Sequence, residues 1–218
     1  MLSDADLIRL QLRTMFLLDR RGRLLAGNEP ARPAPPRIFV TTGRGVRVVR
    51  VRHDVCERHT RDWLACCDDP AALAAKLSEH AIIEREYRGP AYVLPSLEPA
   101  AGAVPLGGPD TPPLHPELLA RGWRTSETGP YVGVVRDGHV VAVCYSSREG
   151  SGACGAGVET AVQYRGLGLA SLAVQSWAAA VQRSGRVALY STEWENLASQ
   201  RLAARLGARQ YGENWHIT

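Results

Sequence analysis

Residues 163–170 have the sequence Gln-Tyr-Arg-Gly-Leu-Gly-Leu-Ala, in which a Gly-x-Gly turn opens a run of small and apolar residues. Residues 153–162 before it are β-compatible and free of proline, and residues 169–182 after it carry apolar side chains at helical spacing. The pattern predicts a turn between a strand and a helix. Because the first N–H groups of a helix lack partners and its dipole is positive there, this turn is predicted to bind an anion such as phosphate.

Other glycine-rich phosphate sites fit this stretch less well. A P-loop ends in Gly-Lys-Ser or Gly-Lys-Thr, and a dinucleotide fingerprint needs a third glycine or alanine and an acidic residue at the end of the next strand. Ser171 stands at the third small position, and Gly185-Arg186 supplies no carboxylate for a ribose. A tight strand-to-helix turn without a ligand is the remaining alternative.

Two motifs in the C-terminal half resemble those of the GNAT acetyltransferase superfamily. Residues 163–168, Gln-x-x-Gly-x-Gly, are similar to its pyrophosphate-binding signature, Arg or Gln-x-x-Gly-x-Gly or Ala. Residues 196–207, Asn-x-x-Ser-x-x-Leu-x-x-x-x-Gly, are similar to its following helix with a terminating glycine. The resemblance covers about residues 110–218, and residues 157–160 and 194–196 suggest a bacterial subgroup. It names no acceptor substrate.

The resemblance implies an N-acetyltransferase that uses acetyl-coenzyme A and transfers the acetyl group directly to an amine. Backbone amides of the turn would hold the pyrophosphate, and the end of the preceding strand would pair with the pantetheine arm, so that positioning supplies much of the rate. The cofactor-binding residues that it implies are Thr160, Ala161, Val162, Gln163, Arg165, Gly166, Leu167, Gly168, Leu169, Ala170, Asn196 and Ser199. For Asn196, a helix N-cap is the structural alternative.

Glu159 is the candidate general base, because it lies on the predicted strand just before the cofactor turn and a partly desolvated carboxylate can accept a proton near working pH. Glu149 and Glu193 are weaker alternatives, and water would suffice for an amine that arrives neutral. Many family members carry a tyrosine as general acid where this chain has Ala203. Candidate replacements for that acid are Tyr190, Ser191, Ser199 and Tyr211.

Two other functions remain open at this stage. The first is a GNAT-derived module that binds coenzyme A or regulates a partner after losing turnover, for which Ala203 is the motivating feature. The second is a different anion, such as a nucleotide phosphate, in the glycine turn. Small-molecule amines and protein amines both remain open as acceptors.

The predicted fold is α/β of the α+β kind: a GNAT-like mixed, mainly antiparallel central sheet flanked by helices, with an additional N-terminal α/β region. We expect this N-terminal region at 1–94, a Pro/Gly-rich linker at 95–113 and the acetyl-CoA-binding domain at 114–218. Predicted helices span 3–18, 55–67, 70–86, 116–121, 167–183 and 196–206. Predicted strands span 37–42, 46–52, 92–94, 131–135, 140–146, 153–162, 187–192 and 209–217, with a hairpin turn at Asp137-Gly138.

Composition narrows the class of protein. The chain has 218 residues, 45% of them hydrophobic, and a net charge of +4 without a stripe of basic and aromatic residues. We therefore expect no nucleic-acid partner, no membrane span and a cytoplasmic location, and dimerisation is left open. The cysteines are Cys56, Cys66, Cys67, Cys144 and Cys154, which we interpret as reduced thiols, and the spacing of His53, Cys56 and His59 favours a helix surface over a metal site.

Overall fold

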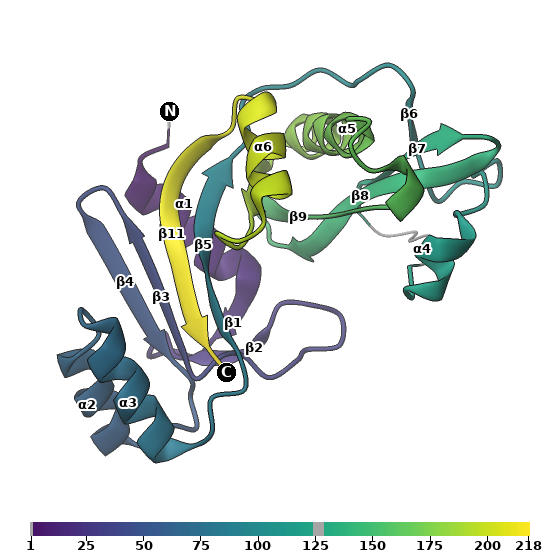
Figure 1. The fold of residues 1–218 in the computed structure, drawn as a ribbon. Coiled ribbons are helices and arrows are strands. Elements are labelled where there is room, and N and C mark those ends of the chain that lie inside the picture. Colours follow the sequence, from purple (N-terminus) through teal and green to yellow (C-terminus); the bar gives the residue numbers. More distant parts are fainter. Residues whose placement is uncertain (1, 124–128) are drawn as a thin grey trace. The chain divides into compact units, whose positions relative to one another are not determined.

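The computed structural model describes residues 2–123 and 129–218, and the chain divides into two compact units (Figure 1). The first unit contains the residues up to Ala91 together with the short segments 192–195 and 210–218. The second unit contains residues 92–191 and 196–209. Each unit is therefore assembled from stretches that are discontinuous in the sequence.

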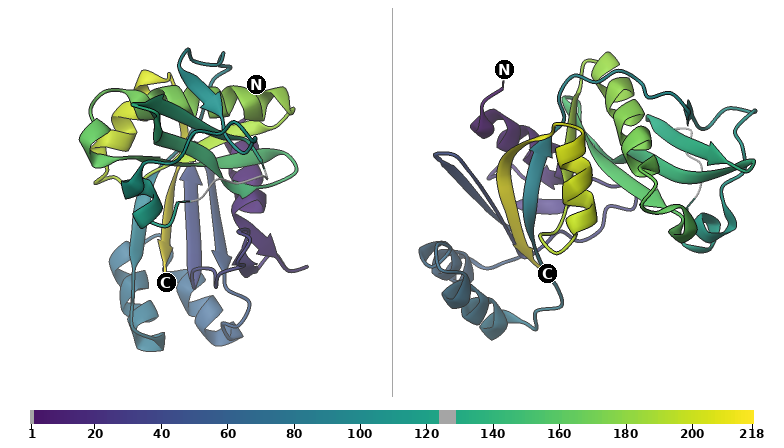
Figure 2. Two further views of the ribbon diagram at one scale, coloured as in Figure 1. Left: turned by 90° about the vertical axis from the view of Figure 1, so that its right-hand side faces the viewer. Right: turned by 45° about the horizontal axis from the view of Figure 1, so that its top comes forward.

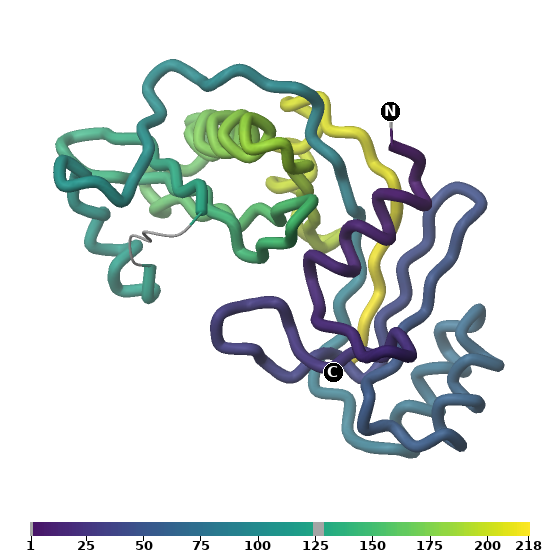
Figure 3. The backbone as a smooth tube through the Cα atoms, turned by 180° about the vertical axis from the view of Figure 1, so that it is seen from behind, coloured from purple at the N-terminus to yellow at the C-terminus, as the bar shows by residue number. Residues whose placement is uncertain are grey.

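The first unit combines helices with a sheet and a separate strand pair. Its helices are α1 (Asp4–Met15), α2 (Glu57–Ala65) and α3 (Pro70–His80), and its strands are β1 (Phe16–Leu18), β2 (Leu24–Gly27), β3 (Ile38–Gly43), β4 (Val46–Val51), β5 (Glu86–Val93) and β11 (Arg209–Ile217). The sheet has the order β4-β3-β11-β5, while β1 and β2 pair antiparallel with each other. Figure 3 shows α1, at the purple end of the chain, lying across the strands of this sheet.

Both faces of this sheet carry buried apolar side chains, as the alternation of β3 predicts. On one face, Val40 and Trp215 belong to a cluster that also contains Trp63 of α2 and the buried leucines of α3. On the other face, the ring of Phe39 meets the ring of Phe16 edge-on, with 5.1 Å between the centroids. The residue after α1 is therefore fixed to the sheet.

Arg37 ties the end of α3 to the last residue of the chain. Its buried guanidinium donates hydrogen bonds to the carbonyl oxygens of Leu77, Ala81, Ile82 and Thr218, at 2.9, 3.0, 3.1 and 3.3 Å. The carbonyl groups at the end of a helix have no helical partners and lie at the negative end of its dipole. One buried cation thus satisfies them and the terminal backbone together.

The second unit contains the predicted mixed sheet flanked by helices. Its elements are β6 (Ala103–Pro105), α4 (Pro116–Ala120), β7 (Tyr131–Arg136), β8 (His139–Glu149), β9 (Ala153–Thr160), the 3₁₀ helix η1 (Val162–Tyr164), α5 (Leu169–Arg183), β10 (Val187–Ser191) and α6 (Leu197–Arg205). The strand order is β10-β9-β8-β7-β6; only β10 and β9 pair in parallel, and the other described pairs are antiparallel. The mainly antiparallel sheet predicted from the sequence is confirmed, and Figure 2 shows α5 lying against it.

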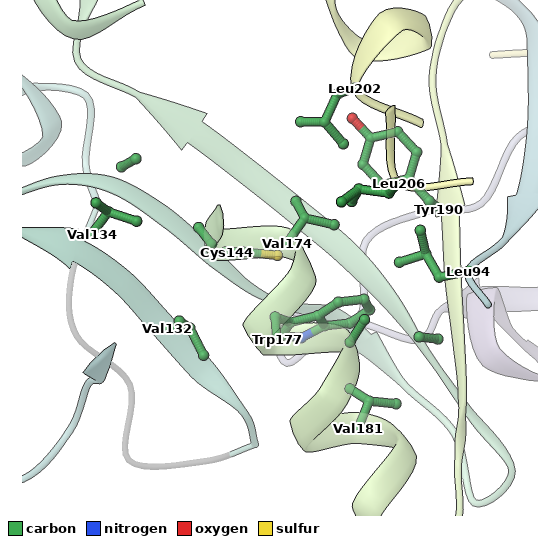
Figure 4. Close-up of a cluster of buried hydrophobic side chains, with 14 of the residues drawn as sticks. Leu94, Val132, Val134, Cys144, Val174, Trp177, Val181, Tyr190, Leu202 and Leu206 are labelled. Carbon is green, nitrogen blue, oxygen red and sulfur yellow. The ribbon is translucent and has the colours of Figure 1, made fainter. Parts of the chain in front are cut away.

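Trp177 lies in the middle of the core of the second unit. Figure 4 shows Val174, Trp177 and Val181 projecting from α5 into a cluster that the strands and α6 complete. The Trp177 side chain is fully buried, and its indole N–H donates to Ser146 Oγ at 3.1 Å. The polar group of this large side chain is therefore satisfied inside the core.

Strand β9 follows β8 along its length but follows β10 only from Ala153 to Gly155. At this point β8 has one extra residue, Ser147, whose neighbours pair with consecutive residues of β9. The Ser147 hydroxyl donates to the Gly155 carbonyl oxygen at 3.0 Å. A β-bulge bends the strand that contains it and increases the local twist, and this bulge in β8 lies opposite the residue at which the pairing of β9 with β10 ends.

The predicted Asp137-Gly138 hairpin joins β7 to β8. Both residues have positive φ, 51° at Asp137 and 75° at Gly138, and the flanking Arg136 and His139 are paired. Positive φ at both central positions defines a type I′ turn, which Asp-Gly favours.

Two predicted helices end earlier than the apolar pattern indicated. The helix expected at 3–18 stops at Met15, because Phe16 pairs with Gly27 and continues as β1. The helix expected at 70–86 stops at His80, where Arg37 binds the carbonyl groups that follow, and Glu86 already begins β5. In both places, pairing with a distant part of the chain overrides the local helical pattern.

The Pro/Gly-rich segment expected as a linker at 95–113 is an ordered part of the second unit. Its backbone bonds to α5: Leu97 N–H donates to Gln182 Oε1 at 3.1 Å and Ala100 N–H to Ser176 Oγ at 2.8 Å. It also supplies β6, which pairs with β7. The expected boundaries differ at the end of the chain as well, since residues 210–218 lie in the first unit.

Replacing Arg37 with methionine is expected to lower the free energy of unfolding by about 3 kcal/mol, because several buried carbonyl groups lose a charged donor. Urea unfolding followed by tryptophan fluorescence measures this change. The control is Arg9→Met, at an exposed arginine of α1, which should stay within about 0.5 kcal/mol of the unchanged protein. Equal stabilities for the two variants would show that Arg37 does not anchor the first unit.

Candidate functional site

The glycine turn begins directly after η1 and ends at the start of α5. Gly166 and Gly168 have φ of 79° and 77°, in the left-handed region that favours glycine, and Gly168 is the N-cap of α5. No side chain caps this helix start. The amides of the first turn of α5, at Leu169 and Ala170, are thus available to an external acceptor.

Several hydrogen bonds hold η1 in front of this turn. The Val162 N–H donates to Glu117 Oε2 at 2.8 Å, and the other oxygen of that carboxylate lies 2.9 Å from Arg121 Nη2. The side-chain amide of Gln163 lies 3.1 Å from His115 Nε2. All of these partners come from α4 or its N-cap, so α4 fixes the entry to the turn.

A pocket of about 630 Å³ opens beside the turn, within the second unit. It is bounded by the end of β9, by the turn with the start of α5, and by one face of α6. The lining residues are Val158, Glu159, Thr160, Tyr164, Arg165, Gly166, Gly168, Leu169, Ala170, Ser171, Asn196, Ala198, Ser199, Arg201, Leu202 and Arg205. The pocket therefore lies where β9 has left β10.

The charge of the lining is mainly positive. The lining contains three arginines, Arg165, Arg201 and Arg205, and a single carboxylate, Glu159. A Cβ built on Gly168 would lie 3.0 Å from Arg205 Nη1, which places this guanidinium against the N-terminus of α5. An anion in the pocket would thus meet both helix amides and a guanidinium.

Thr160 contributes a buried hydroxyl without a partner. The residue is 8% exposed, lines the pocket, and its Oγ1 makes no hydrogen bond to any described residue. Leaving such a group unsatisfied costs about 1–3 kcal/mol, so this hydroxyl is a local source of instability in the ligand-free protein.

Glu159 is engaged by cations on both carboxylate oxygens. Its Oε1 accepts hydrogen bonds from Arg165 and from the Thr160 N–H, both at 3.0 Å, and its Oε2 lies 3.4 Å from Arg121 Nη1. The side chain is 25% exposed and lines the pocket. The other carboxylates considered for proton transfer lie elsewhere: Glu149 is 3.4 Å from Arg186, and Glu193, in the first unit, is 2.6 Å from Arg85.

Helix α6 begins with the motif asparagine. Asn196 is its N-cap, and its Oδ1 accepts the Ser199 N–H at 3.0 Å, which is the structural role considered for this residue. Asn196 and Ser199 both line the pocket as well. Ala203, which stands where the family carries a tyrosine, is fully buried in the core of the second unit, and Tyr190 is 3% exposed in the same core. Tyr211 is buried in the first unit.

Most of the predicted cofactor residues line the pocket, but four do not. Leu167 is 65% exposed, Ala161 is buried in another apolar cluster, Val162 gives its amide to Glu117, and the side chain of Gln163 lies against His115. Residues that the sequence reasoning missed also line the pocket: Val158, Tyr164, Ser171, Ala198, Arg201, Leu202 and Arg205. The Tyr164 hydroxyl donates to Asp137 Oδ2 at 3.0 Å, which raises the pKa of the phenol.

A shift of the signature by two residues explains part of this difference. The sequence Arg165-x-x-Gly168-x-Ala170 satisfies the pattern Arg or Gln-x-x-Gly-x-Gly or Ala as well as residues 163–168 do. Arg165, Gly168 and Ala170 all line the pocket, and Gly168 is the helix N-cap. The later frame therefore describes the pocket better than the frame that begins at Gln163.

The described residues do not meet the requirements for a metal site, a disulfide or a membrane-spanning helix. Within residues 2–123 and 129–218, no group of three His, Cys, Asp or Glu side chains could hold a metal ion, and the five cysteines are unpaired. No helix in the same ranges is long and apolar enough to cross a membrane.

The fold that carries this pocket is similar to those of known proteins. Residues 126–215 match the model of the GNAT acetyltransferase family. The fold is similar to that of a putative GNAT-family acetyltransferase from Novosphingobium aromaticivorans, with a TM-score of 0.50 and 24% identity over 62% of this chain and 66% of that one. Residues 126–215 therefore resemble the GNAT acetyltransferase family, and the likeness to the Novosphingobium structure, at 24% identity, concerns the fold.

Two further solved structures are similar. A GCN5-related N-acetyltransferase from Kribbella flavida has a TM-score of 0.46 and 20% identity, over 66% of this chain and 62% of that one. A GNAT-family acetyltransferase from Colwellia psychrerythraea has a TM-score of 0.49 and 14% identity, over 100% of this chain and 98% of that one. The matched part thus spans less than two thirds of the Novosphingobium and Kribbella chains. No curated protein sequence matches this chain.

Replacing Thr160 with valine is expected to stabilise the ligand-free protein by about 1 kcal/mol, because an unsatisfied buried hydroxyl becomes an apolar group of similar shape. In a chain of this size, that change raises Tm by about 2–4 °C, which differential scanning calorimetry resolves. The matched control is Thr14→Val, because the buried Thr14 hydroxyl donates to Leu10 O at 2.9 Å and its loss should destabilise. Destabilisation by Thr160→Val would mean that the hydroxyl is already satisfied.

Proposed function

We propose that the second unit is an acetyl-coenzyme A dependent N-acetyltransferase that moves an acetyl group directly to an amine. The match of residues 126–215 to the GNAT acetyltransferase family supports the class of reaction. The observation that carries the proposal is the 630 Å³ pocket, in which free helix amides, arginines and an unsatisfied hydroxyl surround one space. The lining offers hydrogen-bond donors for a phosphorylated ligand and a carboxylate, Glu159, for proton transfer.

The residues of this pocket fit coenzyme A. Because Gly168 has no Cβ, a phosphate can approach the first amides of α5; a Cβ at this position would also lie 3.0 Å from Arg205 Nη1. The amides of Leu169 and Ala170 and the guanidinium of Arg205 would hold the pyrophosphate, and Thr160 Oγ1 would gain its missing partner. When bound, acetyl-coenzyme A supplies a thioester whose acetyl carbon is open to attack by an amine nitrogen.

The splayed strand provides the second part of the cofactor site. Along an extended strand, successive residues direct their backbone N–H and C=O groups to opposite sides. From Ala156 to Thr160, β9 pairs with β8 on one side, while its register with β10 ends at Gly155 on the other. An extended pantetheine arm carries amide groups that match the unpaired edge, which would orient the thioester before reaction.

Glu159 remains our candidate general base. Its position at the end of β9, in the pocket lining, supports this role. Glu159 forms ion pairs with Arg121 and Arg165. To accept a proton, one of its oxygens must therefore leave a guanidinium and contact the incoming ammonium or a bridging water. A bound phosphate would compete for Arg165 and so loosen one of these contacts. An amine that arrives neutral needs no such base.

No tyrosine takes the place of the missing family acid in this pocket. Ala203 is buried in the core, and the Tyr164 hydroxyl, which does line the pocket, is committed to Asp137. Ser199 is the hydroxyl on α6 that lines the pocket. A thiolate is a tolerable leaving group, so we propose that it departs without a dedicated tyrosine acid and that protonation by water or Ser199 follows.

A second candidate function rests on the same observation. A module that binds coenzyme A for recognition or regulation needs the pocket but not the acid, and the burial of Ala203 favours it. Binding without transfer to small amines, amino acids or protein amines would identify this case. Binding of nucleotides but not of coenzyme A would point instead to a nucleotide site.

The Gly168→Asp variant is expected to bind acetyl-coenzyme A at least about tenfold more weakly, because its carboxylate repels the pyrophosphate and can pair with Arg205. A loss of about tenfold is the size of effect expected from one charged contact. Isothermal titration calorimetry measures the affinity. The matched control is Gly185→Asp, which has the same φ of 77° and open space around its Cβ outside the pocket. Absence of binding by the unchanged protein would sink the acyltransferase proposal.

The Glu159→Gln variant distinguishes a base from a structural ion pair. If Glu159 accepts the proton, kcat should fall by roughly 10²–10⁴ while the affinity for acetyl-coenzyme A stays near that of the unchanged protein. Steady-state kinetics with an ammonium acceptor, combined with calorimetry, separates the two effects. A small loss of kcat together with altered cofactor affinity would assign Glu159 to positioning Arg165 instead.

A further inference from the structure

We propose that Arg201 and Arg205 of α6 read the phosphates of the coenzyme, with Arg205 on the pyrophosphate and Arg201 on the 3′-phosphate, so that the pocket selects 3′-phosphorylated coenzyme A over its dephospho form. This inference rests on the proposed function, because it concerns the ligand of the same pocket. It assigns cofactor selectivity to two residues outside the glycine turn.

The two arginines share one face of α6. They are four residues apart, which places their side chains one helical turn from each other, and both line the pocket. Arg205 lies against Gly168, at the N-terminus of α5, where the pyrophosphate is proposed to bind. Arg201 lies one turn earlier on the helix, with its Cβ about 5–6 Å from that of Arg205, and so offers a second cationic side chain.

These two charges have no acidic counterpart within the pocket. Glu159 is the one lining carboxylate, and it is already contacted by Arg121 and Arg165. Helix α6 contains no aspartate or glutamate that could pair with Arg201 or Arg205 along its surface. Among the described residues, neither arginine forms a salt bridge. A pair of uncompensated cations at the rim of a pocket favours a ligand with more than one anionic group.

The position of each arginine along α6 indicates whether it also stabilises the helix. Arg205 lies in the last turn of α6, where a cation also interacts favourably with the helix dipole. Arg201 lies in the middle of the helix and gains nothing from the dipole. The helix amides of α5 account for one phosphate group, and Arg201 is left as a donor for another. Thr160, which lines the same pocket, also carries a hydroxyl without a hydrogen-bond partner among the described residues.

The test compares acetyl-coenzyme A with 3′-dephospho-acetyl-coenzyme A by isothermal titration calorimetry at fixed ionic strength. We expect the unchanged protein to prefer the 3′-phosphorylated ligand by about fivefold, the size of effect that a screened, rim-exposed charge pair permits. Arg201→Gln should bind both ligands equally. Arg205→Gln should weaken both by the same factor and keep the preference. The control Arg183→Gln, at an exposed arginine of α5 outside the pocket, should match the unchanged protein.

The outcomes separate this inference from the function on which it rests. Binding of acetyl-coenzyme A with an unchanged preference in Arg201→Gln would overturn the assignment of Arg201 and leave the acyltransferase proposal intact. Loss of the preference in Arg205→Gln alone would reverse the two roles. Failure of the unchanged protein to bind either ligand would remove both proposals. Because the preference is a ratio measured within one variant, partial loss of folded protein does not imitate its disappearance.

Discussion

The pocket of the second unit depends on the divergence of β9 from β10. The two strands pair in parallel from Ala153 to Gly155 and then separate, at the point where Ser147 bulges from β8 and bonds to the Gly155 carbonyl. A sheet that stayed paired would satisfy the backbone of residues 156–160 internally and leave no room beside it. Because this pairing ends at Gly155, one side of residues 156–160 is a strand edge inside the sheet, and the candidate site lies beside it.

The elements around this edge all present donors to the pocket. The left-handed glycines turn the chain so that α5 starts with free amides, α6 adds two arginines, and the end of β9 adds an unsatisfied hydroxyl. The carboxylate of Glu159 is balanced by two guanidinium groups, and that of Glu117 is used by the backbone before the turn. A pocket with this balance of charge favours an anionic ligand before any specific contact is considered.

The sequence predicted the second unit well because its signals are local. Asp-Gly defined the hairpin, the glycines defined the turn, and the helix predicted at 167–183 ends at the same residue as α5. The first unit was harder, because Phe16 and the segment after His80 carry apolar patterns that fit a helix until a distant partner takes them into other structure. The arginines of α6 were missed for a related reason: their approach to the turn depends on how α6 packs, which spacing within the helix does not reveal. The roles proposed for Glu159 and for the cofactor residues stay predictions.

Because the chain passes more than once between the two units, neither unit corresponds to one continuous stretch of the gene. The chain leaves the second unit after Ser191, passes through residues 192–195 of the first unit, returns for α6, and leaves again after Arg209 to form most of the last strand. Helix α6 is thus preceded and followed in the sequence by segments of the first unit. No single cut of the gene yields either unit whole: a fragment that starts after Ala91 carries a terminal strand whose partner β3 has been deleted. The two units are therefore encoded as one continuous stretch and cannot be exchanged separately by a single recombination between genes.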